Sequence, residues 1–251
     1  MYYAKKPELP ASMRTAIVAD IHGNRTAFEA VLADLRRVSP DLVLHGGDLA
    51  DGGSSPAEIV DHIRDLGWRG VLGNTDEMLF RPEALPEFAS GHPNLRDLFR
   101  SIEEMAATTR ETLGEERLAW LRELPRSLIH DGMALVHGTP QSPWHAPSPE
   151  ASDAELESIY RSLGQPVAVY AHIHRPFVRR LPDLTVANTG SVGLSYDGDR
   201  RASYLLIDSG SMEIRRVEYD VAKEVRNLCC CSLPHAPWVM RLVETGSFQM
   251  P

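Results

Sequence analysis

Asp20 and His22 follow the apolar run of residues 16–19, within the stretch TAIVADIHGN. Such a run is typical of a buried strand, and open α/β sheets bind their ligands at the carboxyl ends of such strands. Because residues i and i+2 of a strand project to the same side, we expect the carboxylate of Asp20 and the imidazole of His22 to face one point. Two such groups aimed at one point suit a metal ion better than they suit packing.

Other predicted strands end on polar residues in the same way. LHGGDLA ends on Asp48, LGNTD on Asn74, LVHG on His137, and AHIH on His172 and His174. All of these side chains are carboxylate, amide or imidazole groups, which hard and borderline divalent cations prefer, and no thiolate accompanies them. Taken singly, the acidic and amide residues have an alternative role as caps of the helices or turns that follow. A single histidine is also common as a packed or surface residue.

Alternating strands and helices in the first third of the chain position these residues. The pattern predicts strands at residues 14–20, 41–48 and 68–76 and helices at residues 24–38 and 55–67. Asn24 is placed to cap the first helix, and Pro56 lies in the first turn of the second. This order indicates a βαβαβ unit with parallel strands.

The second half of the chain changes character. Residues 127–138 and 202–219 predict hairpins that turn at Asp131-Gly132 and Ser209-Gly210, and residues 167–174 and 184–191 predict further strands. A mixed or antiparallel sheet therefore follows a parallel one. We expect two sheets packed face to face with helices outside, in one domain over residues 1–251.

Composition narrows the class of protein. The chain has 251 residues, 43% of them hydrophobic, and a formal net charge of −9, so it has no basic surface for duplex nucleic acid. Residues 1–13 lack the apolar core of a signal peptide, and no run of about 18 apolar residues could span a bilayer. We therefore expect a cytoplasmic protein without a membrane partner, and the pattern leaves a homo-oligomer open. We interpret Cys229, Cys230 and Cys231 as buried small residues of a C-terminal helix.

Taken together and in order, DIHGN, GGD, GNTD, VHG and HIH resemble the five motifs of the calcineurin-like metallophosphoesterase family. The resemblance runs from residue 14 to residue 193, and the segment LAWLRELPRSLIHDGMALVHGTP resembles the compact bacterial and archaeal phosphodiesterase branch. It implies that family's α/β fold, a four-layer α-β-β-α sandwich of two mixed sheets flanked by helices.

The resemblance also implies two divalent transition-metal ions, which would be Mn, Fe, Ni, Co or Zn. One ion would be held by Asp20, His22 and His174, the other by Asn74, His137 and His172, and both by the bridging Asp48. Two cations roughly 3.5–4 Å apart can hold a hydroxide that attacks a phosphoryl group, so no protein nucleophile is needed. Asp48, Asn74 and His137 are therefore the predicted catalytic residues of a metal-dependent phosphoesterase.

Thr75 departs from the pattern of the family, in which many relatives have a histidine after the asparagine of the third motif. Threonine cannot donate a proton as an acid near neutral pH, so we expect phosphodiesters as substrates. His45 and His145 are candidates for another acid. Thr75, Asn24 and His145 are the predicted contacts to a small phosphoester.

Three alternatives stay open at this point. Within enzymes, the alternative is a phosphomonoesterase or a nucleotide phosphatase. A non-catalytic interaction module that kept the fold and lost the metals is disfavoured by the complete ligand set. A nuclease is disfavoured by the acidic charge balance.

A helical insertion is predicted at residues 77–124, directly after Asn74 and shortly before the strand that carries His137. We expect it to form a lid over the site. Its arginines are candidate phosphate contacts, because a guanidinium group can bind two phosphate oxygens, or they pair with neighbouring acids. These arginines are Arg81, Arg96, Arg100, Arg110, Arg117 and Arg122.

Overall fold

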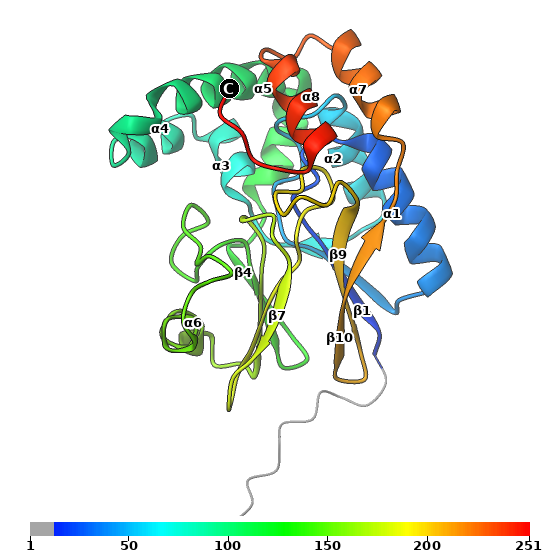
Figure 1. The fold of residues 1–251 in the computed structure, drawn as a ribbon, viewed down its shortest axis with the longest axis vertical. Coiled ribbons are helices and arrows are strands. Elements are labelled where there is room, and N and C mark those ends of the chain that lie inside the picture. The colour runs from blue at the N-terminus through cyan, green and yellow to red at the C-terminus, as the bar shows by residue number, and fades with distance from the viewer. Residues whose placement is uncertain (1–12) are drawn as a thin grey trace, which may run out of the picture.

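Two mixed five-stranded sheets form the centre of the computed structural model, which describes residues 13–251 (Figure 1). The first sheet has the order β10-β9-β1-β2-β3, with β1 to β3 parallel, β9 antiparallel to β1, and β10 antiparallel to β9. Its strands are β1 (Thr15–Val18), β2 (Leu42–His45), β3 (Arg69–Gly70), β9 (Ala202–Asp208) and β10 (Ser211–Val217). Residues 1–12, in which we expect no signal peptide, lie outside the described residues.

The second sheet has the order β4-β5-β6-β8-β7, in which β5, β6 and β8 are parallel and the two edge strands are antiparallel. Its strands are β4 (Ser127–His130), β5 (Met133–Val136), β6 (Val167–Tyr170), β7 (Phe177–Arg180) and β8 (Thr185–Asn188). The predicted hairpin turns at Asp131-Gly132 and Ser209-Gly210 are present. The edge strand β7 was not predicted from the sequence.

The alternation of side chains along each strand builds the layers. Ile17 of β1 and Val169 of β6 point into one apolar layer between the two sheets. Val18 of β1 points outward to a second layer under helices, and Tyr170 of β6 points to a third on the opposite side. The two sheets therefore pack face to face through one shared apolar layer.

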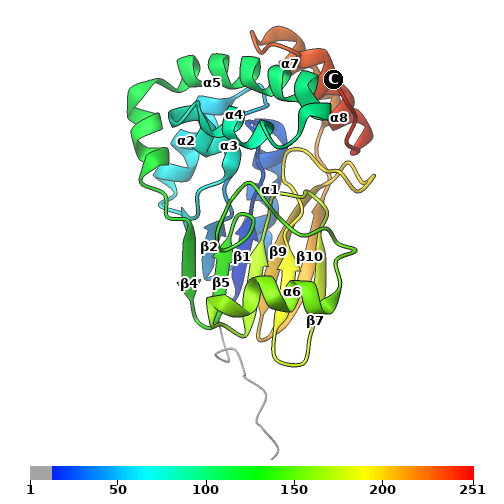
Figure 2. The ribbon, with the colours of Figure 1, turned by 90° about the vertical axis from the view of Figure 1, so that its left-hand side faces the viewer.

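Helices cover both outer faces (Figures 1 and 2). Helices α1 (Arg25–Val38) and α2 (Pro56–Asp65) pack on the first sheet, whereas α6 (Asp153–Tyr160), followed by the short η2 (Arg161–Leu163), packs on the second. Asn24 caps α1 through its side chain, and Pro56 begins α2. The predicted four-layer α-β-β-α sandwich is confirmed, although α6 was not anticipated.

The remaining helices gather at the end of the sheets where β1 and β2 finish (Figure 1). The insertion contains α3 (Asn74–Phe80), α4 (Ala84–Ala89), η1 (Pro93–Leu95) and α5 (Arg96–Arg122). Helices α7 (Val221–Cys230) and α8 (Ala236–Thr245) share an apolar cluster with α5. Within residues 13–251, none of the helices combines the length and the apolar character that a bilayer crossing requires.

The interpretation of the three cysteines as buried residues is wrong. Cys229 and Cys230 are exposed near the end of α7, and Cys231, just beyond it, is partly buried. The amphipathic helix α7 buries Leu228 and Glu224, which are four residues apart on one face. The neighbouring positions 229 and 230 therefore face away from the core.

His45 at the end of β2 is fully buried, and neither of its ring nitrogens has a hydrogen-bond partner among the described residues. Burial lowers the pKa of His45 to about 3. A neutral, enclosed imidazole does not serve as a general acid near neutral pH, so that candidate role is wrong.

This burial predicts a dependence of stability on pH. Between pH 3 and the ordinary histidine pKa near 6.5, the unfolded chain binds a proton at residue 45 that the native state does not. The free energy of unfolding should therefore fall as the pH falls below about 6.5. His45→Leu should remove this contribution, so that wild type loses about 2 kcal/mol more than the variant between pH 7.5 and pH 5 in urea denaturation. Equal losses in the two proteins would contradict a buried neutral His45.

Candidate metal centre

The loops that carry the predicted ligands have an unusual backbone conformation. Positive φ angles, between 49° and 68°, occur at Asp20, His22, Asp48, His172 and His174. Strand β1 ends at Val18 and β6 ends at Tyr170, so these residues follow the strands rather than continue them. The expectation that Asp20 and His22 share one side of an extended strand is therefore wrong in its geometry. Left-handed turns bring the side chains together instead.

Backbone contacts hold the first of these turns. Ser191 Oγ donates to the carbonyl oxygen of Asp20 over 2.7 Å, and the amide nitrogen of Gly193 donates to the same oxygen over 2.9 Å. A Cβ atom at Gly193 would lie 2.0 Å from the carbonyl oxygen of Ile21. The loop after β8 therefore approaches the Asp20 turn so closely that only glycine fits.

Asp20, His22, Asp48 and His174 form the first group of candidate ligands, and one ligand atom from each lies within 4.8 Å of the others. His22 Nε2 lies 3.2 Å from His174 Nε2 and 3.7 Å from Asp48 Oδ2. His174 Nε2 lies 3.6 Å from Asp20 Oδ1. All four residues are buried, so their polar atoms converge in a space shielded from water.

The ligand atoms of this first group are suited to bind a cation. His22 Nδ1 donates to the carbonyl oxygen of Asp51 over 2.7 Å, and His174 Nδ1 donates to that of Leu194. Burial lowers the pKa of both imidazoles, so each Nε2 carries a lone pair rather than a proton. These two lone pairs face each other, and Asp20 Oδ1 is buried without a hydrogen-bond partner among residues 13–251. A cation held between these atoms would relieve the repulsion and give the carboxylate oxygen a partner.

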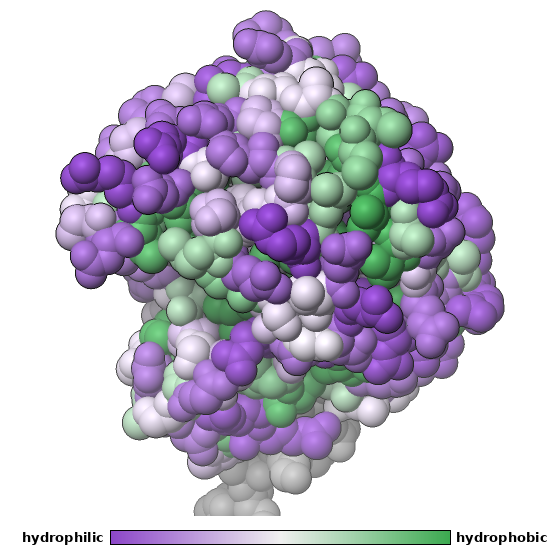
Figure 3. Space-filling view, turned by 45° about the horizontal axis from the view of Figure 1, so that its top comes forward, coloured by the Kyte–Doolittle hydropathy of each residue, from purple (hydrophilic) through white to green (hydrophobic). Residues whose placement is uncertain are grey.

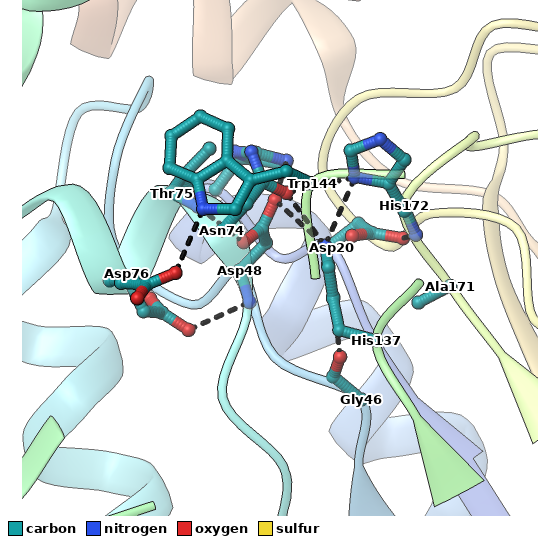
Figure 4. Close-up of polar contacts among 12 residues, drawn as sticks. Asp20, Gly46, Asp48, Asn74, Thr75, Asp76, His137, Trp144, Ala171 and His172 are labelled. Atoms are coloured by element: carbon teal, nitrogen blue, oxygen red, sulfur yellow. Dashed lines mark hydrogen bonds and ion pairs between the residues drawn. The ribbon is translucent and has the colours of Figure 1, made fainter. Parts of the chain in front are cut away.

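Asn74, His137 and His172 form the second group (Figure 4). Asn74 Oδ1 lies 2.9 Å from His137 Nε2 and 2.8 Å from His172 Nδ1, and these two nitrogens are 3.3 Å apart. His137 Nδ1 donates to the carbonyl oxygen of Gly46 over 2.7 Å, which directs Nε2 inward. His172 directs Nδ1 inward, unlike the other three histidines. The second set of predicted ligands therefore also converges.

Asp48 lies between the two groups. Its Oδ2 is 3.7 Å from His22 Nε2 and 3.4 Å from His137 Nε2, and its Oδ1 accepts the amide hydrogen of Thr75 over 2.9 Å. Burial alone would raise the pKa of Asp48, but the facing His137 and His22 outweigh it and lower that pKa. Burial likewise opposes protonation of His137, and Asp48 outweighs it and raises the His137 pKa to about 9. A metal ion bound at this carboxylate therefore competes with a proton.

Asp76 supports Asp48 and was missed in the sequence. Its Oδ2 accepts the amide hydrogen of Asp48 over 2.8 Å, and its Oδ1 accepts that of Leu49 over 2.9 Å (Figure 4). Burial, together with the nearby Asp48, raises the pKa of Asp76 to about 7. The signal was its position two residues after Asn74, on the first turn of α3. Asp76 therefore fixes the backbone that presents the shared carboxylate.

The three predicted substrate contacts have different outcomes. Thr75 lines a cavity that His22, Asp48 and Asn74 also line, and its Oγ1 is buried without a hydrogen-bond partner in residues 13–251. Asn24 does not line this cavity. Its Oδ1 caps α1 at Ala27 and its Nδ2 donates to the carbonyl oxygen of Gly193, so its contact with substrate is a wrong prediction. His145 is exposed beside the ring of Phe88 and also lies outside the cavity lining, and its role stays a prediction.

The helical insertion forms one side of the cavity, which has a volume of about 160 Å³. Leu98, Ile102 and Met105 of α5 line it, together with the candidate ligands. Among residues 13–251, no arginine lines the cavity, so the predicted phosphate contacts of the insertion are wrong. Arg117 of the insertion instead forms an ion pair with Asp61 over 2.6 Å.

The fold and this cluster define the class of the protein as an α/β sandwich with a candidate metal-binding cluster. A sequence model described as the calcineurin-like phosphoesterase superfamily domain matches residues 13–212. The chain belongs to that superfamily.

The chain is also similar to individual proteins. An uncharacterized protein of Methanocaldococcus jannaschii is 29% identical over 243 residues, which cover 87% of this chain and 93% of that protein. A metallophosphoesterase from Sphaerobacter thermophilus is 25% identical with a TM-score of 0.76, and the match covers 94% of this chain and 99% of the other. A hypothetical protein from Pyrococcus horikoshii is 20% identical and shares the fold, with a TM-score of 0.81 and the same coverage.

The contacts of Asp76 predict a measurable effect on metal binding. Asp76→Asn should place an amide NH2 against one of the two backbone N–H groups, and the turn at Asp48 should loosen. We expect the affinity for Mn²⁺ or Zn²⁺ to fall about ten- to hundredfold, as is typical when a group that orients a ligand is lost. Isothermal titration calorimetry on the metal-free protein measures this affinity. The exposed Asp183→Asn is the matched control, and equal affinities in the two variants would contradict the positioning role.

Proposed function

We propose that this protein is a dinuclear metal-dependent phosphoesterase that hydrolyses phosphodiesters. The observation that carries this proposal is the position of Asp48 Oδ2, 3.7 Å from His22 Nε2 on one side and 3.4 Å from His137 Nε2 on the other. One carboxylate between two sets of inward-facing nitrogens is the arrangement that a pair of cations requires. The proposed ions are Mn, Fe, Ni, Co or Zn, which accept such mixed nitrogen and oxygen ligands.

Seven residues are the proposed ligands. Asp20, His22 and His174 would hold one cation, Asn74, His137 and His172 would hold the other, and Asp48 would be shared by both. When bound, the two divalent cations would lower the pKa of water and neutralise the charge of a phosphoryl group. Asp48 sets their spacing, and the neutral histidines leave the pair a net positive charge that attracts a phosphate anion.

The charge of the cavity supports a diester substrate. Within the described chain, neither lysine nor arginine lines the cavity, so no fixed side-chain cation is present there for a second phosphate charge. A phosphodiester has a single negative charge, whereas a phosphomonoester has about two and a nucleotide polyphosphate has more. The same lack of basic residues favours a small phosphoester over duplex nucleic acid.

Thr75 is the proposed contact to the phosphoryl group. Its amide N–H donates to Asp48 Oδ1, whereas its Oγ1, which has no hydrogen-bond partner among the described residues, is free to donate to a phosphoryl oxygen. A threonine hydroxyl stabilises an oxyanion in this way but does not protonate a leaving alkoxide near neutral pH. Good leaving groups therefore suit this site best.

Asp48→Asn tests the shared ligand. The amide should weaken binding of both cations by at least about 100-fold, because even the loss of a group that only orients a ligand costs ten- to hundredfold. Elemental analysis after dialysis should give fewer than two metal equivalents, and hydrolysis of bis(p-nitrophenyl) phosphate should be lost. His62→Ala on α2 is the control, since this histidine lies outside the cavity. Equal metal content and equal rates in the two variants would rule out the proposed bridge.

The presence of threonine at position 75 predicts how the rate of hydrolysis depends on the leaving group. Without a positioned acid, aryl methyl phosphates should be cleaved at least about 100-fold faster than dialkyl phosphates. Thr75→His should make this dependence shallower, because histidine can protonate the leaving oxygen. The measurement is kcat for a series of esters under conditions in which chemistry limits the rate. A flat series in the wild-type protein would mean that another residue supplies the proton.

A further inference from the structure

Apolar side chains build one side of the cavity that contains the candidate ligands. They are Leu98, Ile102 and Met105 of α5, Trp238 and Leu242 of α8, and Phe248 of the segment after α8. These six residues are called the apolar wall. His22, Asp48, Asn74, His172 and His174 line the same cavity, so a bound molecule contacts polar and apolar surfaces together.

The apolar wall is continuous with the candidate metal ligands. The ring of Tyr196 stacks on that of His174, with centroids 4.4 Å apart and an interplanar angle of 18°. Phe248 packs edge-on against Tyr196, with centroids 5.4 Å apart. Trp238 Nε1 donates to the carbonyl oxygen of Gln249 over 2.8 Å, which holds the C-terminal segment in place. An aromatic surface therefore extends from His174, a candidate ligand of the first group, through Tyr196 to the exposed Phe248.

Part of this wall is left open to the cavity instead of being buried in the core. Phe248 is 46% exposed, and Ile102 is partly exposed. In the space-filling view, which tilts this end of the molecule toward the viewer, apolar residues lie among mainly polar surface (Figure 3). An exposed apolar surface beside convergent polar groups is typical of a small-molecule site, where it gains from burial by a ligand.

We infer that the apolar wall binds one ester group of the substrate, so that the substrate class is a phosphodiester with an alkyl or aryl group. This inference rests on the proposed function, because the candidate metal ligands hold the phosphoryl group. The cavity volume of about 160 Å³ is on the scale of a pocket that holds one six-membered ring. An alkyl chain longer than the cavity would extend out of it beside Phe248.

A series of esters with one leaving group tests the apolar wall. Methyl, butyl and hexyl p-nitrophenyl phosphate differ only in the group that stays on phosphorus. With the full-length protein loaded with Mn²⁺, kcat/KM should rise about two- to fourfold per methylene group until the cavity is filled. Calorimetry should show the same order for binding of methylphosphonate, butylphosphonate and hexylphosphonate.

Substitutions in the apolar wall test whether it causes the dependence on chain length. Ile102→Ala and Phe248→Ala should reduce the gain per methylene group in both measurements. Ile129→Ala is the matched control, because Ile129 of β4 is 51% exposed and lies outside the cavity. Its dependence on chain length should equal that of the wild-type protein.

The outcomes separate this inference from the proposed function. Equal kcat/KM values and equal phosphonate affinities along both series would overturn the apolar wall and leave the phosphodiesterase proposal in place. An equal gain per methylene group in Ile102→Ala, Phe248→Ala and Ile129→Ala would overturn it as well. If the loaded protein binds hexylphosphonate more tightly than methylphosphonate but hydrolyses no ester, the wall stands and the proposed function fails.

Discussion

Repulsion among buried ligand atoms is the constraint on which the rest of the structure depends. His22 Nε2 and His174 Nε2 lie 3.2 Å apart with their lone pairs facing each other, and Asp20 Oδ1 beside them has no hydrogen-bond partner within the described part of the chain. Burial of such groups without a compensating charge is unfavourable, and burial of a carboxylate even more so. The fold must therefore hold these atoms together against their own electrostatics. This is the reason to expect a cation here, and it is independent of any resemblance to known proteins.

The convergence of these side chains requires strained backbone conformations. Asp20, His22, Asp48, His172 and His174 all have left-handed φ angles, each of which costs about 1 kcal/mol or more for a residue with a Cβ atom. Contacts to other loops over-determine these turns, as the two hydrogen bonds from Ser191 and Gly193 to one carbonyl oxygen illustrate. The two sheets supply the rigid base, since strands from both end at this point. Strain concentrated at one place in a regular sandwich is typical of a functional site.

The sequence predicted the order of the main strands, the sandwich and the residues that converge, because these follow from local periodicity and from short ordered motifs. It did not predict the left-handed turns, because φ angles at Asp20 or His174 depend on loops distant in sequence. Asp76 was missed for a similar reason, since its contact with the Asp48 amide joins positions 28 residues apart. The prediction for the arginines of α5 was wrong because helical periodicity shows which residues share a face of the helix. It does not show which other element that face contacts. Arg117, for example, meets Asp61 of α2 instead of the cavity.

The proposed chemistry and the inferred selectivity depend on different parts of the chain. The candidate ligands lie on loops at the ends of the central strands, except Asn74, which is the first residue of α3. The apolar wall comes from α5 and from the segment beginning with α8, which pack on each other through the cluster of Leu98, Met105, Trp238 and Leu242. Substitutions in these helices can reshape the wall without moving a candidate ligand, because no candidate ligand belongs to α5 or α8. One metal centre can therefore be combined with different apolar surfaces, and the insertion and the C-terminal helices are the places where substrate preference can change while the proposed chemistry stays constant.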